Sequence, residues 1–289
     1  MLKRTITAII LYGILAPLLL IDALRFFAFI ALAILALIGT WEMIKMFDHD
    51  QKSSLLAKIS TYLANILLSF GIIVSIGTKN LVFFISCLAL GLAILVSMLV
   101  FDKDSNANKL AHSVLSAFLP AIGFGAIMVI RTLGIRFIIY LFLISSLTDT
   151  FAYAYGLLFG KHLLAPNISP KKTWEGSISA TIVASLISIF YAIFYGALFF
   201  NEDKILFVGI GTFASNNQVL ATILVVLGTV LLSVSSQIGD LVFSKMKRTY
   251  GIKDFSNVLP GHGGVLDRFD SVIFASLILC ALMLLVGLV

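Results

Sequence analysis

The sequence predicts an all-α protein, a polytopic integral membrane helical bundle of about nine transmembrane helices with its N-terminus in the cytoplasm. Three observations support this: 60% of the 289 residues are hydrophobic, only 12% are Asp, Glu, Lys or Arg, and the apolar residues form long runs. A soluble domain has about 25% charged residues. The chain therefore carries too little charge to cover a soluble surface, which excludes a cytosolic globular enzyme, a disordered protein and a disulfide scaffold.

Nine segments are apolar enough to cross a bilayer, which takes about 20 residues per helix. They cover residues 5–21, 24–45, 59–78, 80–101, 110–130, 136–160, 174–200, 216–243 and 268–288. The first resembles the apolar core of a signal peptide. Since no persuasive cleavage site separates it from the next run, we interpret it as a retained span.

The chain divides into three regions along these spans. Residues 1–109 hold the N-terminal membrane helices, and residues 110–173 hold the middle helices and a basic cytosolic loop. Residues 174–289 hold the C-terminal helices, with a signature loop at 244–270. No stretch has the composition of a soluble domain.

The basic residues are distributed unevenly between the two sides of the membrane. With a cytoplasmic N-terminus, 15 of the 20 Lys and Arg residues fall on the cytoplasmic side and five on the other. This bias agrees with the positive-inside rule. The two largest loops, 161–173 and 244–267, are then cytoplasmic, where nucleotides are found. We therefore expect a multi-pass protein of the cell's inner or plasma membrane with its active site facing the cytoplasm.

One acidic residue, Asp149, lies inside the sixth predicted span. An ionisable group at membrane depth is costly, so its presence indicates a function. Helical spacing places Ser145, Asp149 and Tyr153 on one face. The alternative is that Asp149 hydrogen-bonds a neighbouring helix and only holds the helices together. Gly156 and Gly160 form a GxxxG pattern, which indicates close helix packing.

A stripe of polar residues follows one face of the eighth predicted span. Its members recur at steps of three and four residues: Ser233, Ser236, Gln237, Asp240 and Ser244. Such a stripe faces protein or a water-filled cavity and not lipid. The simpler alternative is an interface between helices held by hydroxyl groups, but the carboxylate of Asp240 favours a functional site.

The loop before the seventh span reads NISPKKTWEGS. The Ser-Pro pair at 169–170 predicts a turn, and Thr173 or the serine of that pair could cap the next helix. Glu175 would lie in the first turn of that helix, where the helix dipole favours an acid. Lys171 and Lys172 either bind phosphate or only set the membrane topology.

Residues 244–270 read SKMKRTYGIKDFSNVLPGHGGVLDRFD and combine the parts of a nucleoside triphosphate site. Their carboxylates could hold Mg²⁺ against phosphates, their basic side chains could neutralise phosphate oxygens, and their glycines let backbone N–H groups approach an anion. Taken singly, these parts could be a turn, a helix cap and a lipid-headgroup patch. Their co-occurrence next to Asp240 favours the site.

This segment resembles the signature of the phosphatidate cytidylyltransferases, also called CDP-diacylglycerol synthases. That pattern is S-x-hydrophobic-K-R, four residues, K-D, a small residue, P/G-x-H-G-G and D-R-x-D. The matching residues are Ser244, Lys247, Arg248, Lys253, Asp254, Ser256, Pro260, His262, Gly263, Gly264, Asp267, Arg268 and Asp270. The SPKKTWEG stretch and the Asp149 region also resemble family motifs, so the resemblance covers about residues 145–270.

The resemblance implies transfer of a cytidylyl group from CTP to phosphatidate, giving CDP-diacylglycerol and pyrophosphate. It implies Mg²⁺, with or without a second cation, held by Asp240 and Asp267. With Lys253 and Arg268, these two acids form the expected catalytic set. The expected substrate- and phosphate-binding residues are Asp149, Lys171, Lys172, Ser244, Lys247, Arg248, His262, Gly263 and Gly264. The division of the basic residues between CTP and the lipid headgroup stays open.

The expected partners are CTP, phosphatidate and the lipid bilayer, without nucleic acid, and the resemblance implies a homodimer. Two other functions compete with this interpretation. A CTP-dependent polyprenol or phytol kinase would transfer the γ-phosphoryl group and release CDP, but the complete D-R-x-D signature disfavours it. Inverted repeats with broken helices would favour a transporter. The sequence contains no such pairing.

Overall fold

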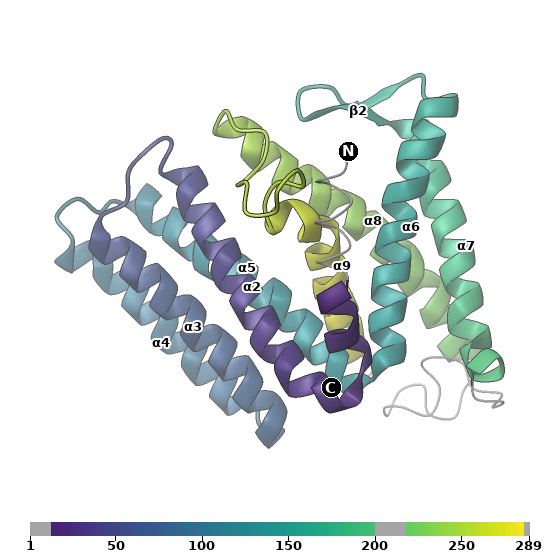
Figure 1. Cartoon of the computed structure of the whole chain (residues 1–289), viewed down its shortest axis with the longest axis horizontal. Helices are drawn as coiled ribbons and strands as arrows, with labels where there is room; N and C mark the ends of the chain where they lie inside the picture. Colours follow the sequence, from purple (N-terminus) through teal and green to yellow (C-terminus); the bar gives the residue numbers. More distant parts are fainter. Residues whose placement is uncertain (1–12, 200–217, 286–289) are drawn as a thin grey trace. The chain divides into compact units, whose positions relative to one another are not determined.

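A computed structural model describes residues 13–199 and 218–285 of the chain (Figure 1). Its helices are η1 (Asp22–Leu24), α2 (Arg25–Phe47), α3 (Leu55–Thr78), α4 (Val82–Phe101), α5 (Ala107–Leu133), α6 (Ile135–Phe159), α7 (Trp174–Phe199), α8 (Gln218–Thr249) and α9 (Leu266–Leu285). Its strands are β1 (Leu163–Ala165) and β2 (Ser169–Thr173). The chain is therefore almost entirely helical over the described residues.

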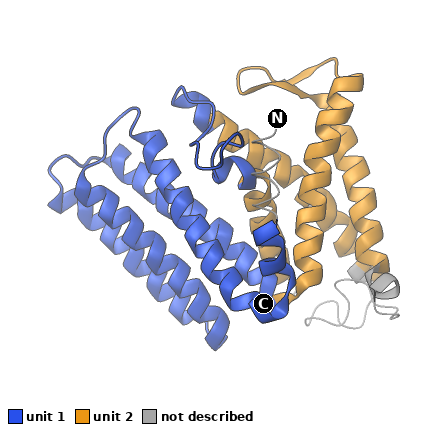
Figure 2. Ribbon diagram, viewed as in Figure 1, with its two compact units in different colours: residues 1–132, 246–269 blue, residues 133–245, 270–289 orange. Residues whose placement is uncertain are grey.

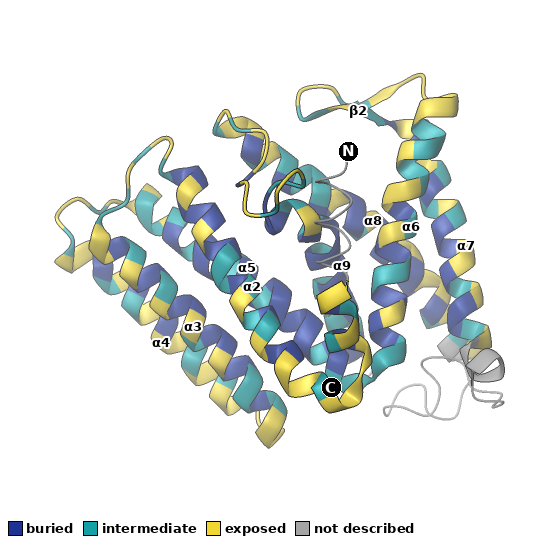
Figure 3. Cartoon of the chain, viewed as in Figure 1, coloured by how far each residue is buried: buried dark blue, intermediate teal, exposed yellow. Residues whose placement is uncertain are grey.

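Eight helices of the described part are long and apolar enough to cross a membrane, namely α2 to α9, with η1 extending α2. Large apolar side chains are exposed along them, as the yellow positions in Figure 3 show. Val100 and Phe101 of α4, for example, are 79% and 76% exposed. Such surfaces suit lipid. This confirms the predicted polytopic helical membrane fold, whereas the first predicted span, 5–21, begins outside the described residues.

The chain forms two compact units, coloured separately in Figure 2. Unit 1 comprises residues 1–132 and 246–269, and unit 2 comprises residues 133–245 and 270–289. The division falls inside α8 and inside α9. The predicted three-region division stays a prediction.

In unit 1, buried polar groups connect α2, α3 and α5. The Thr40 hydroxyl donates a hydrogen bond to the Ser116 carbonyl at 2.9 Å. The Asn65 amide nitrogen donates to Thr40 Oγ1 at 2.8 Å and to the Ala117 carbonyl at 3.1 Å. Hydrogen bonds between apolar helices stabilise their association in lipid. This network joins α2 to α3 and α5.

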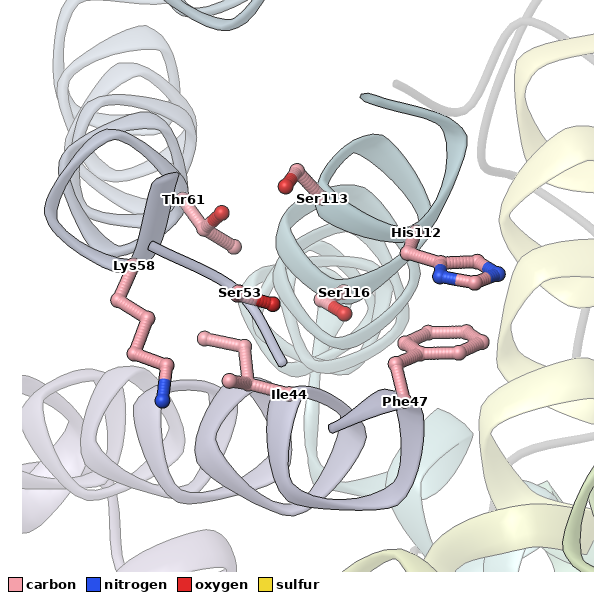
Figure 4. Close-up of a pocket in the computed structure, with 8 residues that line it drawn as sticks. All are labelled: Ile44, Phe47, Ser53, Lys58, Thr61, His112, Ser113 and Ser116. Carbon is pink, nitrogen blue, oxygen red and sulfur yellow. The ribbon is translucent and has the colours of Figure 1, made fainter. Parts of the chain in front are cut away.

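A small pocket lies between the same three helices of unit 1 (Figure 4). Its lining residues are Ile44, Phe47, Ser53, Lys58, Thr61, His112, Ser113 and Ser116. The His112 ring stacks on the Phe47 ring with centroids 4.1 Å apart. The Tyr250 hydroxyl lies 3.0 Å from His112 Nε2, so the residues that follow α8 are tied to α2 and α5.

In unit 2, α6 and α7 pack closely through glycine. A Cβ atom added to Gly176 would lie 2.7 Å from the Ala152 carbonyl oxygen and 2.9 Å from Gly156 Cα. Only a glycine lets the two backbones approach so closely. The close packing predicted from the GxxxG pattern is confirmed at Gly156. Gly160 follows the end of α6 and lies against Thr173.

Helix α8 ends later than the sequence analysis predicted. The signature loop was expected from residue 244, but α8 continues to Thr249, so the connection to α9 covers only residues 250–265. Lys247 and Arg248 occupy the last turn of α8. Cations there are favoured by the negative end of the helix dipole, which explains why this polar segment stays helical. Ser244, Lys247 and Arg248 are therefore presented by a helix.

The predicted loop 161–173 contains an antiparallel hairpin. Leu163 pairs with Thr173 and Ala165 with Ser169. The turn lies at residues 166–168, so the turn predicted at Ser169-Pro170 was wrong. Proline lacks an N–H group, but a two-stranded hairpin has a free edge on each strand, where proline is tolerated.

Candidate functional site

The polar stripe of α8 begins as an interface between helices. Ser233 lies 2.9 Å from the Thr148 hydroxyl of α6, and Ser236 lies 3.2 Å from the Ser145 hydroxyl. Gln237 accepts a hydrogen bond of 2.5 Å from the hydroxyl of Ser177 in α7. This part of the stripe matches the simpler alternative of a hydroxyl-lined helix interface.

The stripe ends at an ion pair. Asp240 Oδ2 pairs with the Lys172 ammonium group of β2, and the Ser244 hydroxyl donates to Asp240 Oδ1 at 3.2 Å. The two charged side chains are 26% and 21% exposed, respectively. The Asp149 carboxyl interacts with the Ser271 hydroxyl and experiences the charges of Asp240 and Lys172. Unit 2 thus gathers five polar side chains from three helices and the hairpin.

The hairpin that carries Lys172 is anchored to the start of α7. The carboxylate of Glu175 accepts hydrogen bonds from the backbone N–H groups of Lys161 and His162 at 3.1 and 3.2 Å. It also lies 2.6 Å from His162 Nδ1. The Thr173 hydroxyl accepts from the Gly176 N–H at 3.2 Å, which confirms the predicted cap. These contacts fix the end of the strand on which Lys172 lies, while Lys171 is exposed.

In unit 1, Asp267 connects α8, the loop and α9. Its Oδ1 accepts from the Lys247 ammonium group at 2.6 Å, and both side chains are nearly buried, at 4% and 9% exposure. Its Oδ2 accepts from the N–H groups of Phe255 at 2.9 Å and Gly264 at 2.8 Å. Asp267 therefore has three partners within the protein and holds the loop against the first turn of α9.

The glycine-rich turn adopts a backbone that needs glycine. Gly261 and Gly263 have φ values of 80° and 86°, which favour glycine because other residues carry a Cβ atom. A Cβ at Gly263 would also lie 2.9 Å from Asp267 Oδ2. Arg268 Nε donates to the His262 carbonyl at 2.8 Å. His262 Nδ1 is buried without a hydrogen-bond partner among the described residues.

Exposed cations precede and follow this turn in the sequence. Arg248 donates to the Ile252 carbonyl at 3.1 Å and is exposed, as are Lys253 and Arg268. Cations at a surface can exchange water for the oxygens of a phosphate group. This part of unit 1 is therefore suited to bind an anion.

One carboxylate of this site was missed by the sequence analysis. Glu42 of α2 is fully buried and accepts hydrogen bonds from Ser256, Val265 and Leu266. The available signal was an acid inside the second predicted span, the same signal that singled out Asp149. Its distance in sequence from the signature segment concealed the connection.

The predicted site residues are distributed over both units. Unit 2 holds Asp149, Lys171, Lys172, Asp240 and Ser244, and unit 1 holds Lys247, Arg248, Lys253, His262, Gly263, Gly264, Asp267 and Arg268. The described ranges contain no group of three or more His, Cys, Asp or Glu residues that could hold a metal ion. The shared use of Asp240 and Asp267 as metal ligands stays a prediction.

The fold defines a polytopic helical membrane protein. Unit 1 holds the glycine-rich turn with the Lys247–Asp267 pair, and unit 2 holds the Lys172–Asp240 pair. The model of the Cytidylyltransferase family matches residues 2–286. The chain therefore belongs to the cytidylyltransferase family.

Curated relatives agree with this assignment. The chain is 38% identical over 277 residues to a phosphatidate cytidylyltransferase of Staphylococcus haemolyticus, and the match covers 94% of both chains. It is 38% identical over 182 residues to the enzyme of that name from Staphylococcus saprophyticus, covering 63% of this chain and 62% of the relative. A Staphylococcus aureus phosphatidate cytidylyltransferase is 37% identical over 182 residues, with the same coverage.

Proposed function

We propose that this protein transfers the cytidylyl group of CTP to phosphatidate, giving CDP-diacylglycerol and pyrophosphate for phospholipid biosynthesis. The observation that carries the proposal is the likeness to a phosphatidate cytidylyltransferase over 94% of both chains. The complete signature between Ser244 and Asp270 supports it. The described chain has eight helices long and apolar enough to cross a membrane, a setting in which a lipid substrate would enter laterally from the bilayer.

The reaction joins two polyanions, so charge neutralisation and alignment are the main tasks. An oxygen of the phosphatidate phosphate attacks the α-phosphorus of CTP. The bond from that phosphorus to the bridging oxygen of the β-phosphate breaks, and pyrophosphate leaves with the electron pair. The attacking oxygen is already anionic near neutral pH, so this step requires no strong general base.

The exposed cations of the signature segment are suited to the phosphates. We assign Lys253 and Arg268 to the reacting phosphates, and Arg248 to the binding of the triphosphate or lipid headgroup. In unit 2, Lys171 and Lys172 take the same role. Lys172 already stands beside a carboxylate, so an incoming phosphate offers its ammonium group a second anionic partner.

The remaining predicted residues take supporting roles in this proposal. Lys247 contributes charge from its buried position, and His262 contacts phosphate or maintains the loop. Gly263 and Gly264 let the backbone approach an anion, although the N–H of Gly264 is used by Asp267. Asp149 and Ser244 belong to the binding surface around Asp240.

We further propose that the enzyme uses Mg²⁺, with or without a second cation, through Asp240 and Asp267. Carboxylates are ligands of the kind Mg²⁺ prefers, and one or two of them suffice when substrate phosphates complete the coordination. Each carboxylate stands beside a lysine ammonium group, so both positions already accommodate positive charge. Bound metal would supply a Lewis acid at the phosphates of CTP.

The test uses purified protein in mixed micelles with phosphatidate, Mg²⁺ and CTP labelled at either the α- or the γ-phosphorus. Label from the α position should enter the lipid, and pyrophosphate should appear in equal amount. Diacylglycerol, which lacks the attacking phosphate, serves as the control substrate. Lipid labelled from the γ position would indicate a kinase, and no lipid product at all would contradict the proposal. Omitting Mg²⁺ with a chelator present should stop turnover. Full activity under these conditions would contradict the proposed use of a metal ion.

We also propose that the site faces the cytoplasm and that the protein is a homodimer. In a background that carries Cys87→Ala and Cys280→Ala, the Lys253→Cys variant should resist an impermeant maleimide until the cells are opened. Labelling of intact cells would reverse the orientation. Light scattering in detergent should give twice the mass of one chain, and the mass of a single chain would contradict the dimer.

A further inference from the structure

We propose that Glu42 is a positioning residue of the signature segment, whose carboxylate holds the start of α9 and the glycine-rich turn in their working arrangement. The inference depends on the proposed function only for its turnover readout. All of the residues concerned belong to unit 1. Glu42 comes from α2, more than 200 residues before its partners in the sequence.

The carboxylate of Glu42 accepts three hydrogen bonds from the segment. Its Oε1 accepts from the Ser256 hydroxyl at 2.6 Å and from the Val265 N–H at 2.8 Å. Its Oε2 accepts from the Leu266 N–H at 2.8 Å. Glu42 has no exposed surface, and it belongs to none of the ion pairs found among the described residues. Among the described residues, the hydrogen bonds of its carboxylate therefore go to the backbone at Val265 and Leu266 and to the Ser256 hydroxyl.

These contacts replace a local helix cap. The first N–H groups of a helix have no partner within the helix, and a nearby Ser, Thr, Asp or Asn commonly supplies one. Here the N–H groups at the start of α9, which extends over 20 residues, are satisfied from α2. A carboxylate at this end of a helix is also stabilised by the helix dipole. The start of α9 is thus capped from α2, while Asp267 of its own first turn holds the preceding glycine-rich turn.

The turn approaches Glu42 so closely that Gly264 has no room for a side chain. A Cβ atom added there would lie 2.3 Å from Oε1 and 2.9 Å from Oε2 of Glu42. The N–H of Gly264 donates to Asp267. The turn is therefore held by two carboxylates, Glu42 from α2 and Asp267 from α9. A displacement at Glu42 would move the residues that Asp267 and Lys247 hold in place.

A purely structural role would not require this residue type. A buried carboxylate costs free energy, and apolar helices pack without one. The oxygens of the Glu42 carboxylate are instead matched to donors of the signature segment, namely two backbone N–H groups and one hydroxyl group. The geometry thus assigns Glu42 to fixing that segment in one position.

The first experiment is Glu42→Gln in the full chain. Glutamine keeps one acceptor oxygen, but its NH₂ group is a donor that opposes the backbone N–H group facing it, and the negative charge that strengthens the remaining bonds is lost. Hydrogen exchange at Val265 and Leu266 should become about 10- to 100-fold faster, the effect of losing a charged hydrogen bond. The kcat should fall about 100-fold through misplacement of reacting groups, with the KM for CTP changed far less.

The matched control is Thr40→Val, which removes the buried hydrogen bonds of the same helix to Ser116 and Asn65. It should leave exchange at Val265 and Leu266, and kcat, at the wild-type level. Wild-type exchange and kcat in Glu42→Gln would overturn the proposal. If Thr40→Val accelerated exchange at Val265 and Leu266 as much as Glu42→Gln, the effect would belong to α2 in general, which also overturns it.

Gly264→Ala tests the same contact from the loop. If Glu42→Gln does not fold, Gly264→Ala provides the deciding measurement. Its methyl group collides with the carboxylate, so exchange at Val265 and Leu266 should again accelerate. In Glu42→Ala the carboxylate is absent, so the new methyl group has room. Adding Gly264→Ala to that variant should therefore accelerate exchange much less than Gly264→Ala does alone. Additive effects would contradict the proposal. If the wild-type protein makes no CDP-diacylglycerol, the proposed function fails, and the exchange measurements still decide the role of Glu42.

Discussion

Two Lys–Asp pairs, Lys247–Asp267 in unit 1 and Lys172–Asp240 in unit 2, have the same chemistry in different surroundings. The first pair is 9% and 4% exposed, and Asp267 also holds two backbone N–H groups. The second is 21% and 26% exposed, and Asp240 has only the Ser244 hydroxyl besides its lysine.

The difference indicates a division of labour. Breaking a buried pair leaves an uncompensated charge away from water, which is strongly destabilising. Breaking a partly exposed pair costs little because water replaces the lost partner. We therefore expect Lys247–Asp267 to maintain the signature segment in addition to the metal contact proposed for Asp267, and Lys172–Asp240 to exchange its partner readily for a substrate phosphate or a cation.

The largest expected effect is on the buried pair. Asp267→Ala leaves the Lys247 ammonium group buried without its partner, together with the N–H groups of Phe255 and Gly264. It should lower the free energy of unfolding by about 3–5 kcal/mol. Titration with SDS, followed by circular dichroism of the detergent-solubilised protein, measures this. The control is Asp240→Ala, for which we expect less than about 1 kcal/mol. Equal losses would remove the distinction between the pairs.

The next effect concerns the packing that supports the hairpin of Lys172. Gly176→Ala brings a methyl group to 2.7 Å from the Ala152 carbonyl oxygen, and such overpacking costs about 1–3 kcal/mol. The control is Gly77→Ala in α3, where a Cβ meets nothing within 4 Å. We expect the control to be neutral or slightly stabilising in the same SDS titration. A neutral Gly176→Ala would show that α6 and α7 can separate without cost.

A smaller effect on stability, with a large one on turnover, is expected for Asp240→Asn. The change removes the ion pair with Lys172 but keeps the side-chain shape, so stability should fall by less than about 1 kcal/mol. Turnover of CTP should fall by about 100-fold or more because a charge at the reacting phosphates is lost. Asp104→Asn, an exposed acid of unit 1, is the matched control. Wild-type turnover in Asp240→Asn would exclude this carboxylate from the reaction.

The smallest effect on stability is expected for Lys253→Gln. Lys253 is exposed, so the free energy of unfolding should stay within about 0.5 kcal/mol of the wild type. Losing a charged contact to phosphate should raise the CTP concentration for half-maximal rate by about 10-fold. Lys103→Gln, another exposed lysine, controls for net charge. An unchanged CTP requirement would leave Lys253 with a role in topology alone.

Local patterns predicted much of the helical framework. The predicted span 24–45 corresponds to α2 (Arg25–Phe47), and 80–101 corresponds to α4 (Val82–Phe101). These helices follow from apolar composition and length, which act within one segment. The late end of α8 was missed because its last turns are polar, although cations are favoured there by the helix dipole.

Partners distant in the sequence could not be predicted in this way. The stripe from Ser233 to Ser244 was visible, but its use as both helix interface and ion-pair site depends on which helix faces each residue. The hairpin and its anchor at Glu175 likewise depend on pairing between strands and not on periodicity.

The sequence by itself determined the membrane class, most of the membrane helices and the residue types of the signature segment. Composition and residue type act locally and do not depend on neighbours brought in by folding. Only the tertiary structure decided that Asp267 is enclosed with Lys247 while Asp240 remains partly exposed with Lys172. It also decided that Glu42 caps α9 from α2. The physical reason is that burial and hydrogen-bond partners depend on which segments meet in space, and that information is not contained in any one segment.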